Sequence, residues 1–271
     1  MNLLISAQEL KAILKDENLI ILDASEDNTM LGKVPEYKGV QIPNSRKFNT
    51  YTDFSDTKAQ FPHTFPNQEQ FEEECQKLGI NQDSHIVVYD NLGVFNSPRV
   101  WWMFNAYGHK NIRVLDGGLP EWINHNYETE PIKRNEFLKG NFKATLDNSS
   151  IKYIDEVKAN ITSKECIVLD ARAKGRFDGT SPEPRQGMRS GHIPNSYSLP
   201  QTEVTKDGKF KSKEEIEEIF SKYNAFNKPM IFSCGSGVTA CIILLASEIA
   251  YPGNKSIYDG SWTEWATLVQ D

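Results

Sequence analysis

The stretch that decides the fold is residues 230–240, which read Met-Ile-Phe-Ser-Cys-Gly-Ser-Gly-Val-Thr-Ala. The first three residues are apolar and predict a buried strand, and the apolar spacing from Val238 to Tyr251 predicts a helix. The glycines between them predict a short loop. Cys234 is therefore expected at the C-terminal end of a strand and directly before a helix, where open α/β sheets bind their ligands.

Cys234 has the surroundings of a reactive thiol. Backbone N–H groups at a helix N-terminus favour a thiolate over a thiol. Gly235 and Gly237 allow the loop to curl with its N–H groups pointing inward. A lone cysteine is more commonly a buried structural residue, but glycines on both sides of Ser236 favour the other interpretation. We interpret Cys234 as a nucleophile.

The two halves of the chain repeat one another. Leu-Asp-Ala at residues 22–24 recurs at 169–171, Ile-Pro-Asn-Ser at 42–45 recurs at 193–196, and Asp-Gly at 116–117 recurs at 259–260. The offsets of 147, 151 and 143 residues are similar over three separated motifs, which indicates a duplicated domain. We expect domains at residues 1–130 and 151–271, joined by a polar linker at residues 131–150.

Each half alternates short apolar runs with helical patterns, which predicts an α/β fold. A continuous apolar strand is buried on both faces, so each domain should hold a mainly parallel sheet with helices on both faces. The expected strands are residues 19–22, 86–89, 112–115, 167–169 and 230–232. The expected helices are residues 6–15, 71–78, 98–107 and 238–251, and the first should begin with Ser6 as N-cap and Glu9 at the capping-box position.

Composition indicates a globular protein. Among 271 residues, 38% are hydrophobic and 25% are charged, and the net charge of −7 disfavours nucleic acid or an anionic membrane as a partner. The start of the chain lacks the pattern of a secretory signal, and the longest apolar tract, residues 240–246, is too short to cross a bilayer. The cysteines show no metal-binding pairing, and a reactive thiol among unpaired cysteines suits the cytoplasm. Three are expected to be inert: Cys75, Cys166 and Cys241.

Residues 234–239, Cys-Gly-Ser-Gly-Val-Thr, resemble the active-site loop of 3-mercaptopyruvate sulfurtransferases in the two-domain rhodanese family. The resemblance covers nearly the whole chain and implies two tandem rhodanese-like domains, of which the second is catalytic. Thiosulfate-using members usually carry Arg-Lys where this chain has Gly235 and Ser236. At the offset of 143 residues, Cys234 corresponds to Asn91, whose amide cannot act as a nucleophile. The first domain is therefore expected to be inactive.

The resemblance also implies an activity. Sulfur would pass from 3-mercaptopyruvate to a Cys234 persulfide, releasing pyruvate, and then to thioredoxin, a small thiol or cyanide. This is two-step covalent catalysis, and it needs neither a metal nor a prosthetic group. The loop around the persulfide would bind it through backbone N–H groups of Gly235, Gly237, Val238 and Thr239.

Two arginines are candidates for binding the donor. Arg176 and Arg185 match the pair that holds the substrate carboxylate and carbonyl in the family, and a guanidinium binds a carboxylate with two parallel hydrogen bonds. Arg176 comes just before residues 178–187 and Arg185 lies within them, and the prolines and glycines of that stretch predict a loop without a helix. The alternative is an ion pair with Glu183 or Asp178.

His63 matches a histidine that faces the catalytic loop in these sulfurtransferases. There it forms a proton relay with the loop serine, here Ser236, and with an acidic residue. This chain has Thr52 at the expected acidic position and Asp53 next to it. The resemblance thus implies His63 and Ser236 as catalytic residues, with the acidic member open.

Three alternatives remain beside the mercaptopyruvate assignment. The first is the same persulfide chemistry with thiosulfate, a compact dianion that a loop with two fixed cations would favour. The second is a phosphatase, which the absence of an arginine after the loop disfavours. The third is a non-enzymatic interaction module, which Cys234 argues against in the second domain.

Overall fold

The computed structural model describes residues 2–27, 29, 32–223 and 228–270. Its contacts divide the chain into two compact units, which follow the two halves of the sequence apart from two short exchanges. The first unit is Met1–Asp56, Phe65–Leu146 and Asp207–Phe210, and the second is Thr57–Thr64, Asp147–Lys206 and Lys211–Asp271. Each unit is an α/β domain, as predicted.

The first unit is built on a five-stranded parallel sheet in the order β1-β6-β5-β2-β4. The strands are β1 (Leu4–Ile5), β6 (Ile112–Leu115), β5 (His85–Tyr89), β2 (Leu19–Asp23) and β4 (Arg46–Lys47). A short antiparallel pair, β3 (Val40–Gln41) with β7 (Glu130–Pro131), lies in the same unit.

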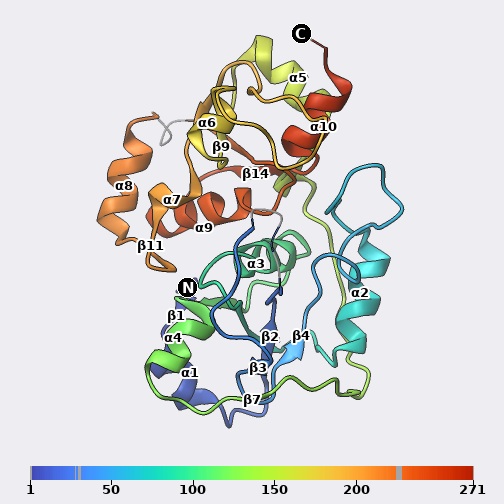
Figure 1. The fold of residues 1–271 in the computed structure, drawn as a ribbon. Coiled ribbons are helices and arrows are strands. Elements are labelled where there is room, and N and C mark those ends of the chain that lie inside the picture. The colour runs from blue at the N-terminus through green and yellow to red at the C-terminus, as the bar shows by residue number, and fades with distance from the viewer. Residues whose placement is uncertain (1, 28, 30–31, 224–227, 271) are drawn as a thin grey trace. The chain divides into compact units, whose positions relative to one another are not determined.

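Helices cover the sheet because alternate strand residues point to opposite faces. The helices are α1 (Ala7–Ile13), α2 (Gln68–Lys77), α3 (Ser97–Ala106) and α4 (Gly118–Asn124). Leu10 of α1 and Trp122 of α4 share a core with Val87 and Tyr89 of β5, and Figure 1 shows these two helices side by side. Helix α1 begins at the expected capping box, in which Ser6 and Glu9 satisfy each other's backbone N–H groups.

The second unit repeats this topology. Its parallel sheet has the order β10-β9-β13-β14-β8, which is the order of the first sheet read from the other edge. The strands are β8 (Ile151–Lys152), β9 (Ile167–Asp170), β10 (Ser196–Ser198), β13 (Met230–Ser233) and β14 (Lys255–Tyr258). The duplication predicted from the three motifs is confirmed.

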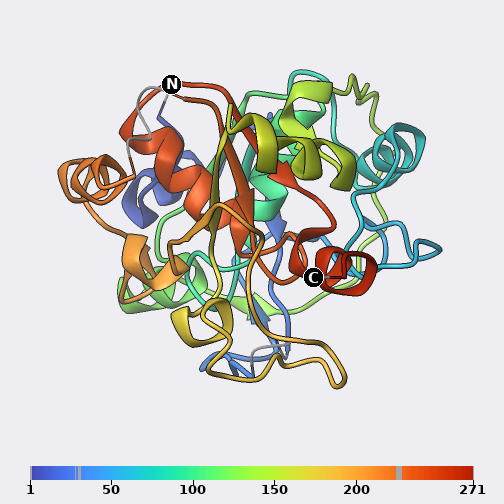
Figure 2. The ribbon, with the colours of Figure 1, turned by 90° about the horizontal axis from the view of Figure 1, so that it is seen from above.

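In the described part of the second unit the helices are α5 (Ile154–Ser163), α6 (Lys174–Phe177), α7 (Gln201–Val204), α8 (Lys213–Ser221), α9 (Ala240–Ala250) and α10 (Ser261–Leu268). Helix α8 packs on α9, and the two lie side by side in both views (Figures 1 and 2). Val157 of α5 and Trp265 of α10 share a core with Ile231 of β13. A 3-10 turn (Asn148–Ser150) precedes β8, and β11 (Thr205–Lys206) pairs with β12 (Lys209–Phe210).

The expected linker at residues 131–150 belongs largely to the first unit, which extends through Leu146. Phe142 is fully buried, and its backbone N–H donates to the Ile80 carbonyl at 3.1 Å. Single contacts of this kind leave no hydrophobic periodicity in the sequence. The sequence pattern therefore could not distinguish this packed segment from a linker. Residues 178–187 form no helix, as predicted, and the single turn of α6 ends just before them at Phe177.

Among the described residues, no helix combines the length and apolarity that crossing a membrane requires.

Candidate active site

Cys234 directly follows β13, and its thiol lies in the second unit. Ser233, the last residue of the strand, pairs with Asp170 of β9, so the cysteine is at the carboxyl edge of the sheet as predicted. The side chain is buried. The Cys234 N–H donates to Ser261 Oγ at 3.3 Å, and its carbonyl accepts from the Trp262 N–H at 3.0 Å. The start of α10 therefore fixes the backbone of the nucleophile.

The two loop glycines serve different purposes. Gly237 has φ of 78°, a left-handed conformation that side chains disfavour. At Gly235 the backbone is not left-handed, and a Cβ there would make a tight contact of 3.1 Å with Arg176 Nη2. The Gly235 carbonyl accepts from the N–H of Thr263 at 3.0 Å and from its hydroxyl at 2.5 Å. Helix α9 begins at Ala240, so Ser236, Val238 and Thr239 lie in the loop before it.

Arg176 projects from α6 and reaches this loop. Its Nη2 and Nε donate to Glu183 Oε2 at 2.5 and 3.1 Å, so the ion-pair alternative is confirmed for Glu183. The proximity of Nη2 to Gly235 shows that the same guanidinium borders the catalytic loop. Arg176 thus has a carboxylate partner and also borders the residue next to Cys234.

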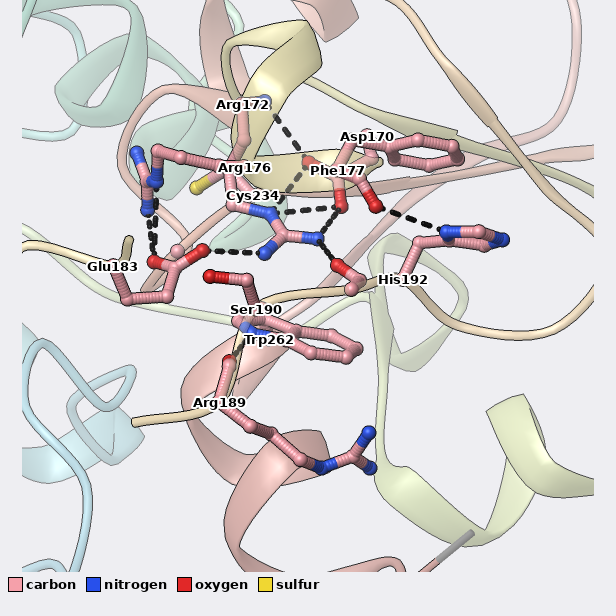
Figure 3. Close-up of polar contacts among 12 residues, drawn as sticks. Asp170, Arg172, Arg176, Phe177, Glu183, Arg189, Ser190, His192, Cys234 and Trp262 are labelled. Atoms are coloured by element: carbon pink, nitrogen blue, oxygen red, sulfur yellow. Dashed lines mark hydrogen bonds and ion pairs between the residues drawn. The ribbon is translucent and has the colours of Figure 1, made fainter. Parts of the chain in front are cut away.

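Glu183 joins two arginines. Its second oxygen, Oε1, accepts from Arg172 Nη1 at 2.7 Å, and Figure 3 shows the carboxylate between the two guanidinium groups. Arg172 also contacts Asp170 at 2.6 Å and lies 4.5 Å from the ring centroid of Trp262. Burial opposes the charge of Arg172, but Asp170 and Glu183 outweigh it and raise its pKa. Two buried carboxylates therefore balance two arginines beneath the loop.

Arg185 reaches the loop through a different residue. Its Nη1 donates to Thr263 Oγ1 at 2.5 Å, and that hydroxyl donates in turn to the Gly235 carbonyl. The structure thus brings Cys234, Gly235, Arg176 and Arg185 together within one unit. The donor-binding roles that the resemblance implies for Arg176 and Arg185 stay predictions.

His63 lies in Thr57–Thr64, the segment that groups with the second unit. It adopts φ of 61°, which is uncommon for a residue with a side chain. Thr52 and Asp53 belong to the first unit, where the Thr52 hydroxyl donates to Asp53 Oδ1 at 2.8 Å. The relay of His63 with Ser236 stays a prediction, and so does its acidic member.

The residue at the cysteine position of the first unit is Asp90, and the assignment of Asn91 is wrong. Tyr89, the last residue of β5, pairs with Asp23, just as Ser233 pairs with Asp170. Asp90 follows Tyr89 as Cys234 follows Ser233. The offset of 143 residues was measured on the Asp-Gly motif at residues 116–117 and 259–260, which lies beyond this loop. Between the strand end and that motif the first unit has one residue more than the second. Asn91 instead hydrogen bonds the Glu26 backbone.

The Asp90 carboxylate occupies the loop that follows β5. Its Oδ2 accepts from the N–H groups of Phe95, Asn96 and Ser97 and from the Ser97 hydroxyl, all at 2.7–2.9 Å. Its Oδ1 accepts from the Leu92 N–H at 2.9 Å. A loop of inward N–H groups is an anion-binding concavity. In the first unit this concavity is filled by a side chain of the chain itself.

Sequence reasoning missed Ser261 and Thr263 and treated Glu183 only as a competing partner. A signal existed for Ser261, because the repeat places Gly118 opposite it in the first unit. Gly118 has φ of 55°, and Ser261 keeps φ of 50° despite its side chain. Such strain costs on the order of 1–3 kcal/mol and clusters at functional sites. Within the described residues, no group of three or more histidine, cysteine or acidic side chains could hold a metal ion.

Comparison with known proteins matches one family in both halves of the chain. The rhodanese-like domain family matches residues 6–125 and again residues 153–268. 3-Mercaptopyruvate sulfurtransferase from Mus musculus is 39% identical over 270 residues, covering 97% of this chain and 90% of that protein. Thiosulfate sulfurtransferase from Cricetulus griseus is 40% identical over 237 residues, covering 85% of this chain and 78% of that protein.

Among solved structures, SseA from Escherichia coli, described as a 3-mercaptopyruvate sulfotransferase, superposes with a TM-score of 0.84 at 31% identity. The match covers 97% of this chain and 99% of that one. The likeness therefore extends over both units.

Proposed function

The chain belongs to the rhodanese family, and from that premise we propose that it acts as a 3-mercaptopyruvate sulfurtransferase. The observation that carries this proposal is the placement of two arginines at the residue beside the nucleophile. Arg176 borders Gly235, and Arg185 is joined to it through Thr263. The donor 3-mercaptopyruvate has a carboxylate and a carbonyl group beside its sulfur-bearing carbon. The oxygens of these two groups can accept hydrogen bonds from the two guanidinium groups.

In the first half-reaction the Cys234 thiolate attacks the sulfur of 3-mercaptopyruvate. A sulfur–sulfur bond forms, the carbon–sulfur bond breaks, and its electron pair leaves with the carbon as the enolate of pyruvate. The enolate takes up one proton, which the outer sulfur or a nearby acid supplies. Arg176 and Arg185 stabilise the negative charge that develops on the enolate oxygen and on the carboxylate.

The second half-reaction returns the thiolate. An acceptor thiolate or cyanide attacks the outer sulfur of the persulfide, and the electron pair of the sulfur–sulfur bond returns to Cys234. Thioredoxin, a small thiol and cyanide are the acceptor classes we propose. While the persulfide waits, the loop N–H groups before α9 hold its charge.

Thiosulfate is the competing donor. The similarity to thiosulfate sulfurtransferases favours it, whereas the uncharged Gly235 and Ser236 do not. Arg176 would also oppose a cationic side chain at position 235, since a Cβ there would lie 3.1 Å from its Nη2. This loop therefore suits a carboxylate donor better than a compact dianion.

Intact-mass spectrometry tests the nucleophile, and steady-state kinetics test the donor. Wild-type protein treated with 3-mercaptopyruvate should gain one sulfur atom, Cys234→Ser should gain none, and the control Cys166→Ser should still gain one. Sulfur on Cys75, Cys166 or Cys241 would show that the nucleophile is misassigned. A kcat/KM that is higher for thiosulfate than for 3-mercaptopyruvate would show that the sulfur donor is misassigned.

A further inference from the structure

We propose that Thr263 is a positioning residue that couples Arg185 to the catalytic loop and so favours donors that carry a carboxylate. The inference deepens the proposed function and rests on it for the identity of the donor. It starts from one hydroxyl that lies 2.5 Å from both Arg185 Nη1 and the Gly235 carbonyl.

The direction of this hydrogen-bond chain is fixed by chemistry. A guanidinium can only donate and a carbonyl can only accept, so the single proton of the Thr263 hydroxyl goes to Gly235. The lone pairs of the hydroxyl then accept from Arg185. A hydroxyl that donates in this way is a better acceptor, because neighbouring hydrogen bonds polarise one another. The arginine therefore has a fixed partner on the loop side.

Thr263 itself has little freedom to move. It lies in the first turn of α10, only 5% of its surface is exposed, and its backbone N–H also donates to the Gly235 carbonyl. The preceding residue, Trp262, donates its N–H to the Cys234 carbonyl at 3.0 Å. Arg185 is thus held relative to Cys234 through a rigid element rather than through the loop alone.

Removing the Thr263 hydroxyl should change the orientation of Arg185 without changing the form of the catalytic loop. The Gly235 carbonyl keeps its backbone partner, so the catalytic loop should retain its form. Arg185 loses its hydrogen bond to Thr263, so its guanidinium is less firmly oriented for a donor carboxylate. The loss should fall on binding of carboxylate ligands, and less on the rate of sulfur transfer once the donor is bound.

The test uses Thr263→Val, which removes the hydroxyl at similar volume, and Thr263→Ser, which keeps it. Thr267→Val is the matched control, because that hydroxyl donates to the Thr263 carbonyl one turn along the same helix. We expect Thr263→Val to raise KM for 3-mercaptopyruvate by about tenfold, the loss of roughly one hydrogen bond, with a smaller change in kcat. Thr263→Ser and Thr267→Val should stay near the wild-type values.

Pyruvate binding measured by calorimetry separates this inference from the proposed function. Pyruvate has the carboxylate and carbonyl but no sulfur to transfer, so its affinity should fall in Thr263→Val and recover in Thr263→Ser. That pattern supports the inference even if the wild type does not turn over 3-mercaptopyruvate, in which case only the proposed function fails. Wild-type protein that binds no pyruvate, or equal affinities in all four proteins, would overturn the inference.

Discussion

Replacing Glu183 with glutamine should weaken the second unit and disturb the donor site together. The substitution keeps the size of the side chain but removes its charge. One oxygen of the carboxylate accepts from Arg172 at 2.7 Å and the other from Arg176 at 2.5 Å. In Glu183→Gln one of these guanidinium groups would face an amide NH2. Both groups are hydrogen-bond donors, so no hydrogen bond could form between them.

The magnitude follows from the burial of the three side chains. Glu183, Arg172 and Arg176 are 2%, 0% and 13% exposed, so solvent compensates little. Breaking a buried ion pair costs about 3–5 kcal/mol, and a hydrogen bond to a charged group contributes about 1.5–3 kcal/mol. Arg172 keeps its ion pair with Asp170, so the loss should stay below the upper end of the range for a buried ion pair. We therefore expect a loss of about 2–4 kcal/mol in the free energy of unfolding.

Urea unfolding followed by tryptophan fluorescence measures this loss, with Glu218→Gln on the exposed face of α8 as the control. The kcat/KM for 3-mercaptopyruvate should fall in Glu183→Gln and stay unchanged in Glu218→Gln, because only the former frees Arg176 from its partner. A Glu183→Gln protein with the wild-type unfolding midpoint and unaltered kinetics would refute the view that this carboxylate holds the arginines in place.

Three further predictions follow from separate features. Arg185→Lys should lower kcat/KM for 3-mercaptopyruvate by about 1.5–3 kcal/mol in the barrier, because an ammonium cannot form the fork, and an unchanged donor preference would contradict this. Asp90→Asn should destabilise the first unit by about 2–4 kcal/mol while sparing catalysis, because both carboxylate oxygens accept from backbone N–H groups and an amide nitrogen in either position cannot; urea unfolding with parallel assays checks it. Burial and the charge of Arg113 lower the pKa of His85 below its usual 6.5, so the unfolded chain binds the proton first. Stability from His85 is therefore present above about pH 6.5 and lost as pH falls through the lowered pKa, and His85→Gln should flatten the difference between urea midpoints measured at about pH 7.5 and 5.5.

Much of the fold could be predicted because its signals are local. Apolar runs locate the strands, the capping box at Ser6 locates the start of α1, and the repeated motifs imply one topology used twice. Cys234 was found for the same reason, since a strand, a glycine-rich loop and a helix follow one another in sequence.

The missing parts depend on contacts between distant segments. Glu183 lies 7 and 11 residues from the arginines it joins, and Thr263 lies 78 residues from Arg185. No pattern in one sequence announces such pairs. Asp90 was missed by one position, because an offset measured on one motif does not hold across a loop that differs in length between the two halves.

The Asp90 carboxylate has a consequence for how much sulfur the chain can carry. An anion attached to the loop it fills is present at an effective concentration in the millimolar range or above, so dissolved donors compete poorly for that place. Asp90 also offers no sulfur atom on which a persulfide could form. Loading by an excess of donor should therefore saturate at one transferable sulfur per chain, whatever the donor concentration. The chain therefore has two copies of the fold but carries only one transferable sulfur atom.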